Sequence, residues 1–340
     1  MKQTESPLPD WFSPLPCRAG YIWKSIKHNL TNISDTSLLV LHEDQLVYER
    51  YFHGRTKDIP QAMFSVTKSI VSALVGIAIQ DGLIRDVQQK AADFFPEAKT
   101  DDERKRAITV EHLLTMRSGL PGDGDRQESP WWRAADSGLA AFEMPLVAAP
   151  GGHFSYSSGP GMQALACLLS RAAGRNLFEY AREKLFAPLG MASVRWDAAA
   201  DGASFGGFGI SMAARDMLRF GQLYLNGGRW NGEQILPEGW VQSSIPRGLK
   251  DHRGYGYGYL FRQIEKKYPD TYQAQGQFGQ FIDISPARNA VIVRTGCPGP
   301  VVTACIKTLR FLEKKHLKLQ TLKTLFEMQG VPLDYLAHLK

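Results

Sequence analysis

The chain has 340 residues, of which 44% are hydrophobic and 22% are charged. This composition is typical of a globular protein with one large domain or two closely packed ones, and it excludes a disordered or fibrous chain. The formal net charge is +6, and residues 307–340 contribute most of it, with seven lysines and arginines against three acidic residues. The body is therefore close to neutral and carries no basic stripe, so we expect no nucleic-acid binding.

The N-terminal sequence indicates the compartment. Its first residues, MKQTESPLPDWFSPLPC, contain prolines and acids where a signal peptide has an apolar run. No stretch reaches the ~18 uninterrupted apolar residues of a membrane span. These features predict a cytoplasmic protein without a membrane span.

The cysteines and histidines show no ligand spacing. Cys17, Cys167, Cys297 and Cys305 are scattered along the chain, which predicts reduced thiols and not a disulfide or zinc framework. The eight histidines also lack metal-ligand spacing. We therefore expect no metal and no cofactor, whereas the oligomeric state leaves no mark in the sequence.

Predicted strands lie at both ends of the body. Two β-rich runs, residues 37–42 and 46–52, predict a hairpin. Near the other end, strands are expected over residues 257–263, 272–284 and 290–295. The middle of the chain is mainly helical, with helices expected over residues 162–173 and over residues 212–225, the second capped by Ser211.

This order of elements predicts an α/β (α+β) fold. An antiparallel sheet built from residues 35–60 and 255–315 and flanked by helices would join a mainly helical second lobe, residues 85–250. Residues 35–315 would form this domain, residues 1–34 an N-terminal arm, and residues 316–340 a C-terminal helix and tail.

The chain is organised around residues 63–82, MFSVTKSIVSALVGIAIQDG, which predict a buried helix. Ser65 and Lys68 lie three residues apart at its start, so their side chains share one face, and the free N–H groups of the helix end lie beside the serine. A serine hydroxyl needs a base to attack a carbonyl, and a lysine serves only where its surroundings favour the neutral amine. A helix-capping serine followed by a surface lysine is the alternative, and for an isolated Ser-x-x-Lys it is the commoner one.

Three later segments carry further candidates. Turn formers flank Tyr156-Ser157-Ser158 on both sides. Trp131 and Trp132 follow a long Gly-rich loop and would either line a pocket or anchor that loop to the core. Ser204 lies in a Gly-x-Ser-x-Gly pattern, but no apolar strand precedes it and no helix follows, so we do not expect it to be a nucleophile.

Together these motifs resemble the class C β-lactamase-like serine hydrolases, whose fold is shared with penicillin-binding proteins. Ser65-Val66-Thr67-Lys68 matches Ser-x-x-Lys, Tyr156-Ser157-Ser158 matches the Tyr-x-Asn loop, and Gln275-Gly276-Gln277 matches the third motif at a strand edge. The flanking phrases ITVEHLLTMRSGLP and GGFGISMAARDMLRFGQLYLNGGRWNG support the resemblance, which spans about residues 35–315. It implies a β-lactamase/transpeptidase-like fold.

The resemblance implies acyl transfer to a serine. Ser65 would be the nucleophile, and Lys68 with Tyr156 would move its proton, either of the two being the base. The backbone N–H groups of Ser65 and Gln277 would hold the oxyanion. Further contacts with the substrate are expected from the following residues: Ser158, Gly276, Trp131, Trp132 and Tyr255.

Two departures from the family pattern bear on the substrate. Ser158 replaces the asparagine, and Ala274-Gln275-Gly276 replaces Lys-Thr-Gly, so the motif lacks its cation. The sequence is thus most similar to the esterase and 6-aminohexanoate-dimer hydrolase branch, and we expect hydrolysis of a carboxylic ester or a small linear amide. The alternatives are a β-lactamase or penicillin-binding DD-peptidase, and a non-catalytic ligand-binding protein on the same fold.

Overall fold

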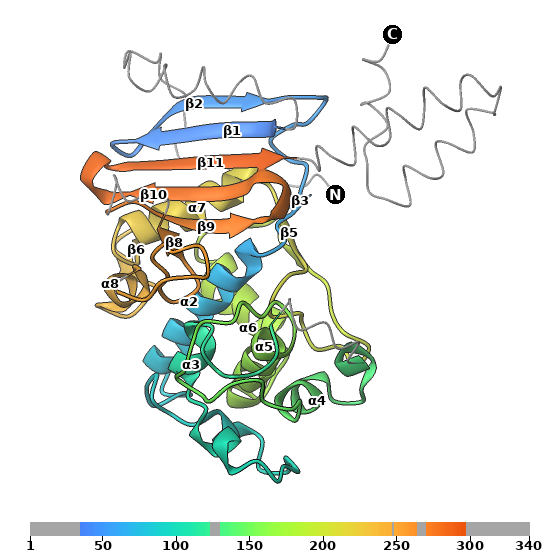
Figure 1. Cartoon of the computed structure of the whole chain (residues 1–340). Coiled ribbons are helices and arrows are strands. Elements are labelled where there is room, and N and C mark those ends of the chain that lie inside the picture. Colours follow the sequence, from blue (N-terminus) through green and yellow to red (C-terminus); the bar gives the residue numbers. More distant parts are fainter. Residues whose placement is uncertain (1–34, 123–129, 247, 264–269, 297–340) are drawn as a thin grey trace, which may run out of the picture.

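The computed structural model describes residues 35–122, 130–246, 248–263 and 270–296. Its largest sheet is antiparallel and six-stranded, in the order β2-β1-β11-β10-β9-β8. The strands are β1 (Asp35–His42), β2 (Gln45–Tyr51), β8 (Arg262–Gln263), β9 (Tyr272–Gly276), β10 (Gln280–Ser285) and β11 (Ala290–Gly296). The expectation of one antiparallel sheet assembled from both ends of the chain is therefore confirmed (Figure 1).

Two helices connect this sheet to the rest of the molecule. α7 (Ala214–Leu225) packs closely on β10 and β11. The close approach requires glycine at position 221, because a Cβ there would lie 2.5 Å from a methyl group of Val291. α2 (Val66–Gln80) is buried from its first residue to Ala78 and contacts β9, β10 and α5. An apolar helix such as α2 is stable only when it is covered on all sides. It lies between the sheet and the helical lobe (Figure 1).

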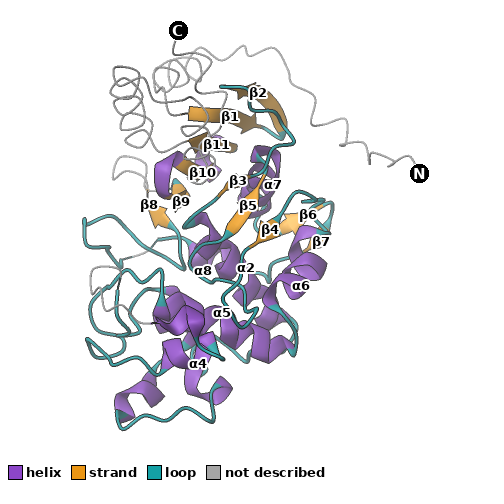
Figure 2. Cartoon of the chain, turned by 90° about the vertical axis from the view of Figure 1, so that its right-hand side faces the viewer, coloured by secondary structure: helices purple, strands orange, loops and turns teal. Residues whose placement is uncertain are grey.

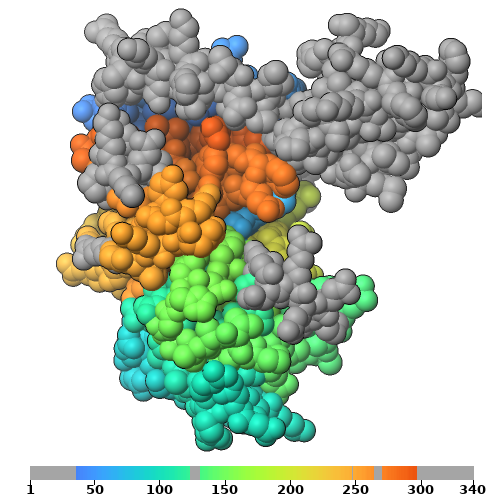
Figure 3. All heavy atoms as spheres, viewed as in Figure 1, coloured from blue at the N-terminus to red at the C-terminus, as the bar shows by residue number. Residues whose placement is uncertain are grey.

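Most of the remaining helices lie in the helical lobe, which is green and cyan in Figure 3 and lies below the orange residues of the C-terminal part of the chain. The remaining helices are α3 (Val110–Leu114), α4 (Ser137–Phe142), α5 (Pro160–Ala173), α6 (Leu177–Ala181), which continues into a π-helical turn (Arg182–Phe186), and α8 (Trp240–Ser244). Short 3₁₀ turns cover Ala91–Phe94, Glu103–Ala107, Pro130–Arg133, Gln277–Gly279 and Pro286–Arg288. Two small sheets are formed by β3 (Gln61–Ala62), β5 (Ile210–Met212) and β4 (Arg195–Trp196), and by β6 (Arg229–Trp230) and β7 (Glu233–Gln234). In Figure 2 the strand β5 lies between the large sheet and the helices.

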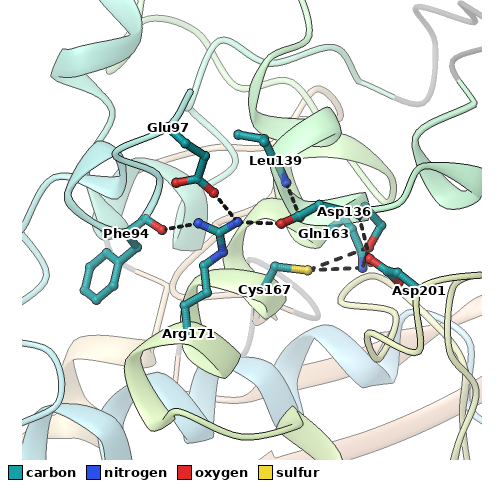
Figure 4. A network of polar contacts seen from close by, with 9 residues as sticks. Phe94, Glu97, Asp136, Leu139, Gln163, Cys167, Arg171 and Asp201 are labelled. Carbon is teal, nitrogen blue, oxygen red and sulfur yellow. Dashed lines mark hydrogen bonds and ion pairs between the residues drawn. The ribbon is translucent and has the colours of Figure 1, made fainter. Parts of the chain in front are cut away.

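Arg171 of α5 ties the helical lobe together (Figure 4). Its guanidinium pairs with Glu97 at 2.6 Å and with Asp136 at 2.5 Å, and it donates to the carbonyl oxygen of Phe94 at 2.7 Å. Asp136 also caps α4 by accepting from the backbone N–H of Leu139. One arginine thus joins three segments of the lobe, and a planar guanidinium suits this because its donors diverge in fixed directions.

Three predicted elements were wrong in their bounds. The expected strand over residues 272–284 is two strands, because Gln277–Gly279 forms a turn in which Phe278 has φ 60°. The helix expected from residue 212 begins at Ala214, and Ser211 lies in β5 and not at the cap. A tight turn interrupts the first run, whereas in the second the strand β5 extends through Met212 before the helix begins.

The expected strand over residues 257–263 also shrinks, to β8, and Tyr257 makes only an isolated bridge to Arg262. The predicted N-terminal arm (residues 1–34), the helix and tail after residue 297, and Cys17, Cys297 and Cys305 lie outside the described residues. The boundaries of the 35–315 domain therefore stay a prediction.

Candidate active site

A cavity of about 680 Å³ opens at the N-terminus of α2, where Ser65 lies half-buried. Ser65 occupies the N-cap position, yet its hydroxyl makes no capping bond to the helix backbone. The described lining residues come from several separate segments: Ala62, Phe64, Ser65, Tyr156, Ser158, Asp197, Gly207–Ser211, His252, Arg253, Arg262, Gln275, Gly276 and Gln277. The helix start, the Tyr156 loop and the third-motif strand, which are far apart in the sequence, therefore meet at one cavity.

Lys68 lies behind Ser65 and is almost fully buried, with 1% exposure. Its Nζ donates to Ser65 Oγ at 2.7 Å, to Ser158 Oγ at 3.0 Å and to the carbonyl oxygen of Gly207 at 2.8 Å. Three acceptors match the three protons of an ammonium group, so the side chain is held in one orientation. This geometry excludes the reading of Lys68 as a surface lysine.

Tyr156 lies on the cavity wall beside this lysine. The centre of its ring is 4.8 Å from Lys68 Nζ and 5.1 Å from the Cζ of Arg262. Both cations lie within the range at which an aromatic ring attracts positive charge. Ser65, Lys68 and Tyr156 are thus brought together, as the order of the motifs predicts.

The third motif also lies close to the head of α2. A Cβ at Gly276 would lie 2.2 Å from the carbonyl oxygen of Met63, so only glycine allows this contact. Gly276 and the following Gln277 line the cavity together with Ser65. This is the place where the backbone N–H groups of Ser65 and Gln277 are expected to form an oxyanion site.

Several lining residues were missed by the sequence analysis. Arg253 and Arg262 bring positive charge to the cavity, and both pair with Asp251, whose side chain is fully buried, at 3.6 and 3.4 Å. Arg262 also donates to Gln275 at 3.3 Å. The cavity therefore carries arginines from a neighbouring segment, although the third motif itself has no cation. The run of alternating aromatic and glycine residues before Arg262 carried no signal that distinguishes a wall residue from a core residue.

Three of the expected substrate contacts lie elsewhere. Trp131, Trp132 and Tyr255 are absent from the described lining of the cavity. Trp131 is 6% exposed and contacts Phe205 edge-to-face at 6.2 Å, which makes it an anchor of the loop. The alternative of core anchoring therefore holds for Trp131. By contrast, Ser158 and Gly276 do line the cavity.

Ser204 also lies outside the described lining, and it is buried with 3% exposure. Its hydroxyl donates to Asn176 at 3.4 Å, and its carbonyl oxygen accepts from Gln163. The glycines that follow it pack tightly, since a Cβ at Gly207 would lie 1.9 Å from the carbonyl oxygen of Ser158. The loop thus supplies a carbonyl group to Lys68 and not a nucleophile.

A second tyrosine near the site is held in its neutral form. Burial, together with the nearby Tyr156 and Asp251, raises the pKa of Tyr257 well above its usual value. Its ring packs edge-to-face on Phe154 at 4.9 Å and lies 5.8 Å from the Cζ of Arg262. Tyr257 therefore supports the wall behind Tyr156 and is not suited to be a base.

The described residues show neither a metal-ligand cluster nor a candidate membrane span. They contain no group of three or more His, Cys, Asp or Glu side chains placed to hold a metal ion. Within the same residues no helix combines the length and the apolar character needed to cross a membrane.

The antiparallel sheet, the helical lobe and a Ser-x-x-Lys pair at the head of the helix between them define the class of β-lactamase and penicillin-binding-protein folds. The chain belongs to the beta-lactamase family, whose model matches residues 25–295. The family assignment made from the three motifs is confirmed.

Known relatives agree with this assignment. A 6-aminohexanoate-dimer hydrolase of Paenarthrobacter ureafaciens is 27% identical over 244 residues, which cover 66% of this chain and 61% of that protein. A penicillin-binding protein homologue from Caulobacter crescentus has a similar structure, with a TM-score of 0.69 and 17% identity over 84% of this chain and 92% of that one. A family VIII carboxylesterase matches with a TM-score of 0.65 and 18% identity, over 80% and 89% of the two chains. At these identities the solved structures bear on the fold alone.

Proposed function

We propose that this protein is a serine hydrolase that cleaves a carboxylic ester or a small linear amide through an acyl-enzyme on Ser65. The observation that carries the proposal is the contact of 2.7 Å between the buried Lys68 Nζ and Ser65 Oγ at the edge of a cavity. A hydroxyl at the start of a helix, hydrogen-bonded to a lysine, has what nucleophilic catalysis requires. The name of the curated relative supports an amide as one substrate.

The reaction would proceed in two halves. Ser65 Oγ attacks the carbonyl carbon and gives its proton to the base, which is either Lys68 as a neutral amine or Tyr156 as a phenolate. The backbone N–H groups of Ser65 and Gln277 stabilise the oxyanion that forms. The proton then passes to the leaving alcohol or amine as its bond to carbon breaks. Water attacks the acyl-enzyme in the same way and releases the acid.

Removal of the nucleophile tests this proposal. We expect Ser65→Ala to lose the hydrolysis of a short-chain p-nitrophenyl ester while its circular dichroism and melting temperature stay unchanged. Ser204→Ala is the matched control, because it removes the serine of the other motif and should keep full activity. Full activity of Ser65→Ala would refute the proposal.

Two other functions are alternatives to this proposal. The arginines in the cavity favour a β-lactamase or DD-peptidase as the second candidate, since they could hold a substrate carboxylate. Nitrocefin hydrolysis that depends on Ser65 would support it.

A non-catalytic binding protein is the third candidate, and the failure of a fluorophosphonate probe to label Ser65, read by peptide mass, would support that one. A panel of esters, linear amides and lactams, with 6-aminohexanoate dimer among the amides, would identify the substrate class. The cytoplasm is the compartment that we propose.

A further inference from the structure

Two phenylalanines next to the proposed oxyanion donors have an unusual backbone. Phe64 precedes Ser65 and has φ 49°, and Phe278 follows Gln277 and has φ 60°. In this left-handed region glycine and asparagine are common and bulky residues are rare. Each donor of the proposed oxyanion site is therefore flanked by a large side chain in a conformation that favours a small one.

The rings of these two residues are in contact. Their centroids lie 5.0 Å apart at an angle of 73°, which is the edge-to-face arrangement. This geometry is one of the two that aromatic pairs prefer. Close beside it, Gly276 approaches the carbonyl oxygen of Met63. The turn before the nucleophile and the turn of the third motif therefore pack against each other through backbone and side chains.

The third-motif turn is also held from within the sheet. Gln280 is 1% exposed, and its Nε2 donates to the carbonyl oxygen of Gly296 at 2.7 Å and to that of Phe278 at 3.4 Å. This side-chain amide connects the turn to the end of β11. The ring of Phe278 remains 38% exposed, and it does not belong to the described lining of the cavity. The contact with Phe64 is thus what this ring contributes to the site.

We infer that Phe278 is a positioning residue that, through its contact with Phe64, sets the distance between the Ser65 and Gln277 N–H groups. The inference rests on the proposed function, because it assigns a role in stabilising the oxyanion. Oxyanion donors act only when they are fixed before the reaction begins. The two packed rings would fix two chain segments between which the strand registers of the described residues contain no pairing.

Truncation of the ring tests the inference. Removal of an entire oxyanion donor costs about 10²- to 10³-fold in kcat, so we expect Phe278→Ala, which only loosens one donor, to lose about 10- to 100-fold in kcat with KM within about twofold. Binding of an alkyl boronic acid, which forms a tetrahedral adduct with the serine, should weaken by the same factor. The pH dependence of kcat should not change, because no titrating group is removed. Phe278→Tyr keeps the ring and should restore most of the activity.

Two controls separate positioning from general damage. Val147→Ala truncates another exposed apolar side chain, which is 45% exposed and lies outside the described lining of the cavity. This variant should leave kcat, KM and the binding of the boronic acid unchanged. The double variant Phe64→Ala/Phe278→Ala should lose little more kcat than the less active single variant, because the two substitutions remove the same ring contact.

The possible results distinguish failure of this inference from failure of the proposed function. Wild-type kcat in Phe278→Ala, a loss confined to KM, or additive losses in the double variant would overturn the inference. Turnover that survives Ser65→Ala would instead refute the proposed function and this inference with it, whereas turnover that needs Ser65 but not Phe278 would refute the inference alone.

Discussion

Lys68 Nζ lies 3.0 Å from the hydroxyl oxygen of Ser158, a residue 90 positions further along the chain. Ser158 stands where the Tyr-x-Asn motif has its asparagine. A hydroxyl can accept from an ammonium group just as an amide oxygen can. The departure from the motif therefore preserves one acceptor for the buried lysine, although it removes the amide donor.

We expect Ser158→Ala to lower kcat by about tenfold. A typical intramolecular hydrogen bond is worth about 0.5–1.5 kcal/mol net, and about 1.4 kcal/mol corresponds to a factor of ten. Lys68 would keep Ser65 Oγ and the Gly207 carbonyl as acceptors, so we expect a partial loss. Steady-state kinetics with a p-nitrophenyl ester measures the change, and Ser158→Thr, which keeps the hydroxyl, is the matched variant. An alanine variant with wild-type kcat would show that this contact does not help to orient Lys68.

Replacement of Lys68 tests its role more directly. Lys68→Arg keeps a positive charge, but a guanidinium does not give up a proton in proteins. We therefore expect Lys68→Arg and Lys68→Met to be nearly inactive, about 10³-fold below the parent protein or lower. Melting curves would show whether either variant fails to fold. A folded Lys68→Arg variant with near-parental rates would exclude this lysine as the base and leave Tyr156.

The general fold could be predicted because its signals are local. The strands near residue 40 and the apolar helix after Ser65 follow simple periodic patterns. The turn over Gln277–Gly279 could not be predicted, because a phenylalanine at a positive φ contradicts the usual preference for glycine there. Residues 272–284 therefore read as one strand although they form two.

The site could be predicted only as far as its motifs extend. Spacing and motif order, which reflect the helix face and the succession of loops, predict that Ser65, Lys68 and Tyr156 lie together, and the structure places them so. Arg262 could not be found in this way, because it lies outside the three motifs and its place in the cavity depends on the pairing of β8 with β9 beside Gln275. Trp131 was expected to contact the substrate, but it lies in the core and outside the described lining of the cavity. An aromatic residue after a Gly-rich loop suits a pocket wall and a core anchor equally well, so its sequence context could not separate the two.

Arg262 should influence which substrates are hydrolysed. Its side chain is only 14% exposed, and it lines the cavity next to Gln275. We expect Arg262→Gln to raise KM about tenfold for an ester that carries a carboxylate and to leave a neutral ester of equal length within about twofold. Arg262→Lys should show a smaller loss because it keeps the charge. Arg229→Gln, on the exposed hairpin β6–β7, controls for net charge. An equal change for both esters would contradict this prediction.

The ion pair between Glu49 and Arg215 should contribute to stability above pH 5. Arg215 donates two bonds of 2.6 Å to the carboxylate, and the two side chains are 10% and 16% exposed. Burial alone would raise the pKa of Glu49, but the hydrogen bonds from Arg215 and Tyr51 outweigh it and hold this pKa below its usual range. A lowered pKa means that the folded state binds the proton less well than the unfolded state. The stabilisation is therefore present above the usual pKa of about 4.3 and is lost as the pH falls.

Chemical denaturation between pH 3 and pH 7 checks this expectation. The free energy of unfolding of Glu49→Gln should depend less steeply on pH below about 5 than that of the parent protein. At pH 7, Arg215→Met should cost about 3 kcal/mol, because it leaves a buried carboxylate unpaired. Arg85→Met is the control, since its pair with Asp86 is largely exposed to solvent and should contribute little to stability. Equal costs for the two arginine variants would contradict the assignment.

Cys167 should be inert in the folded protein. It lies in the helical lobe near Ser137 and Gln163, and it is 5% exposed (Figure 4). Burial raises the pKa of its thiol to about 12. The thiolate is the reactive form, and at pH 8 such a thiol is ionised to about one part in 10⁴, against about a quarter for a free cysteine. We expect iodoacetamide to leave the Cys167 peptide unmodified in buffer and to modify it in urea, as read by peptide mass. Modification at the same rate in both conditions would mean that the lobe opens readily, because alkylation requires both access of the reagent and ionisation of the thiol.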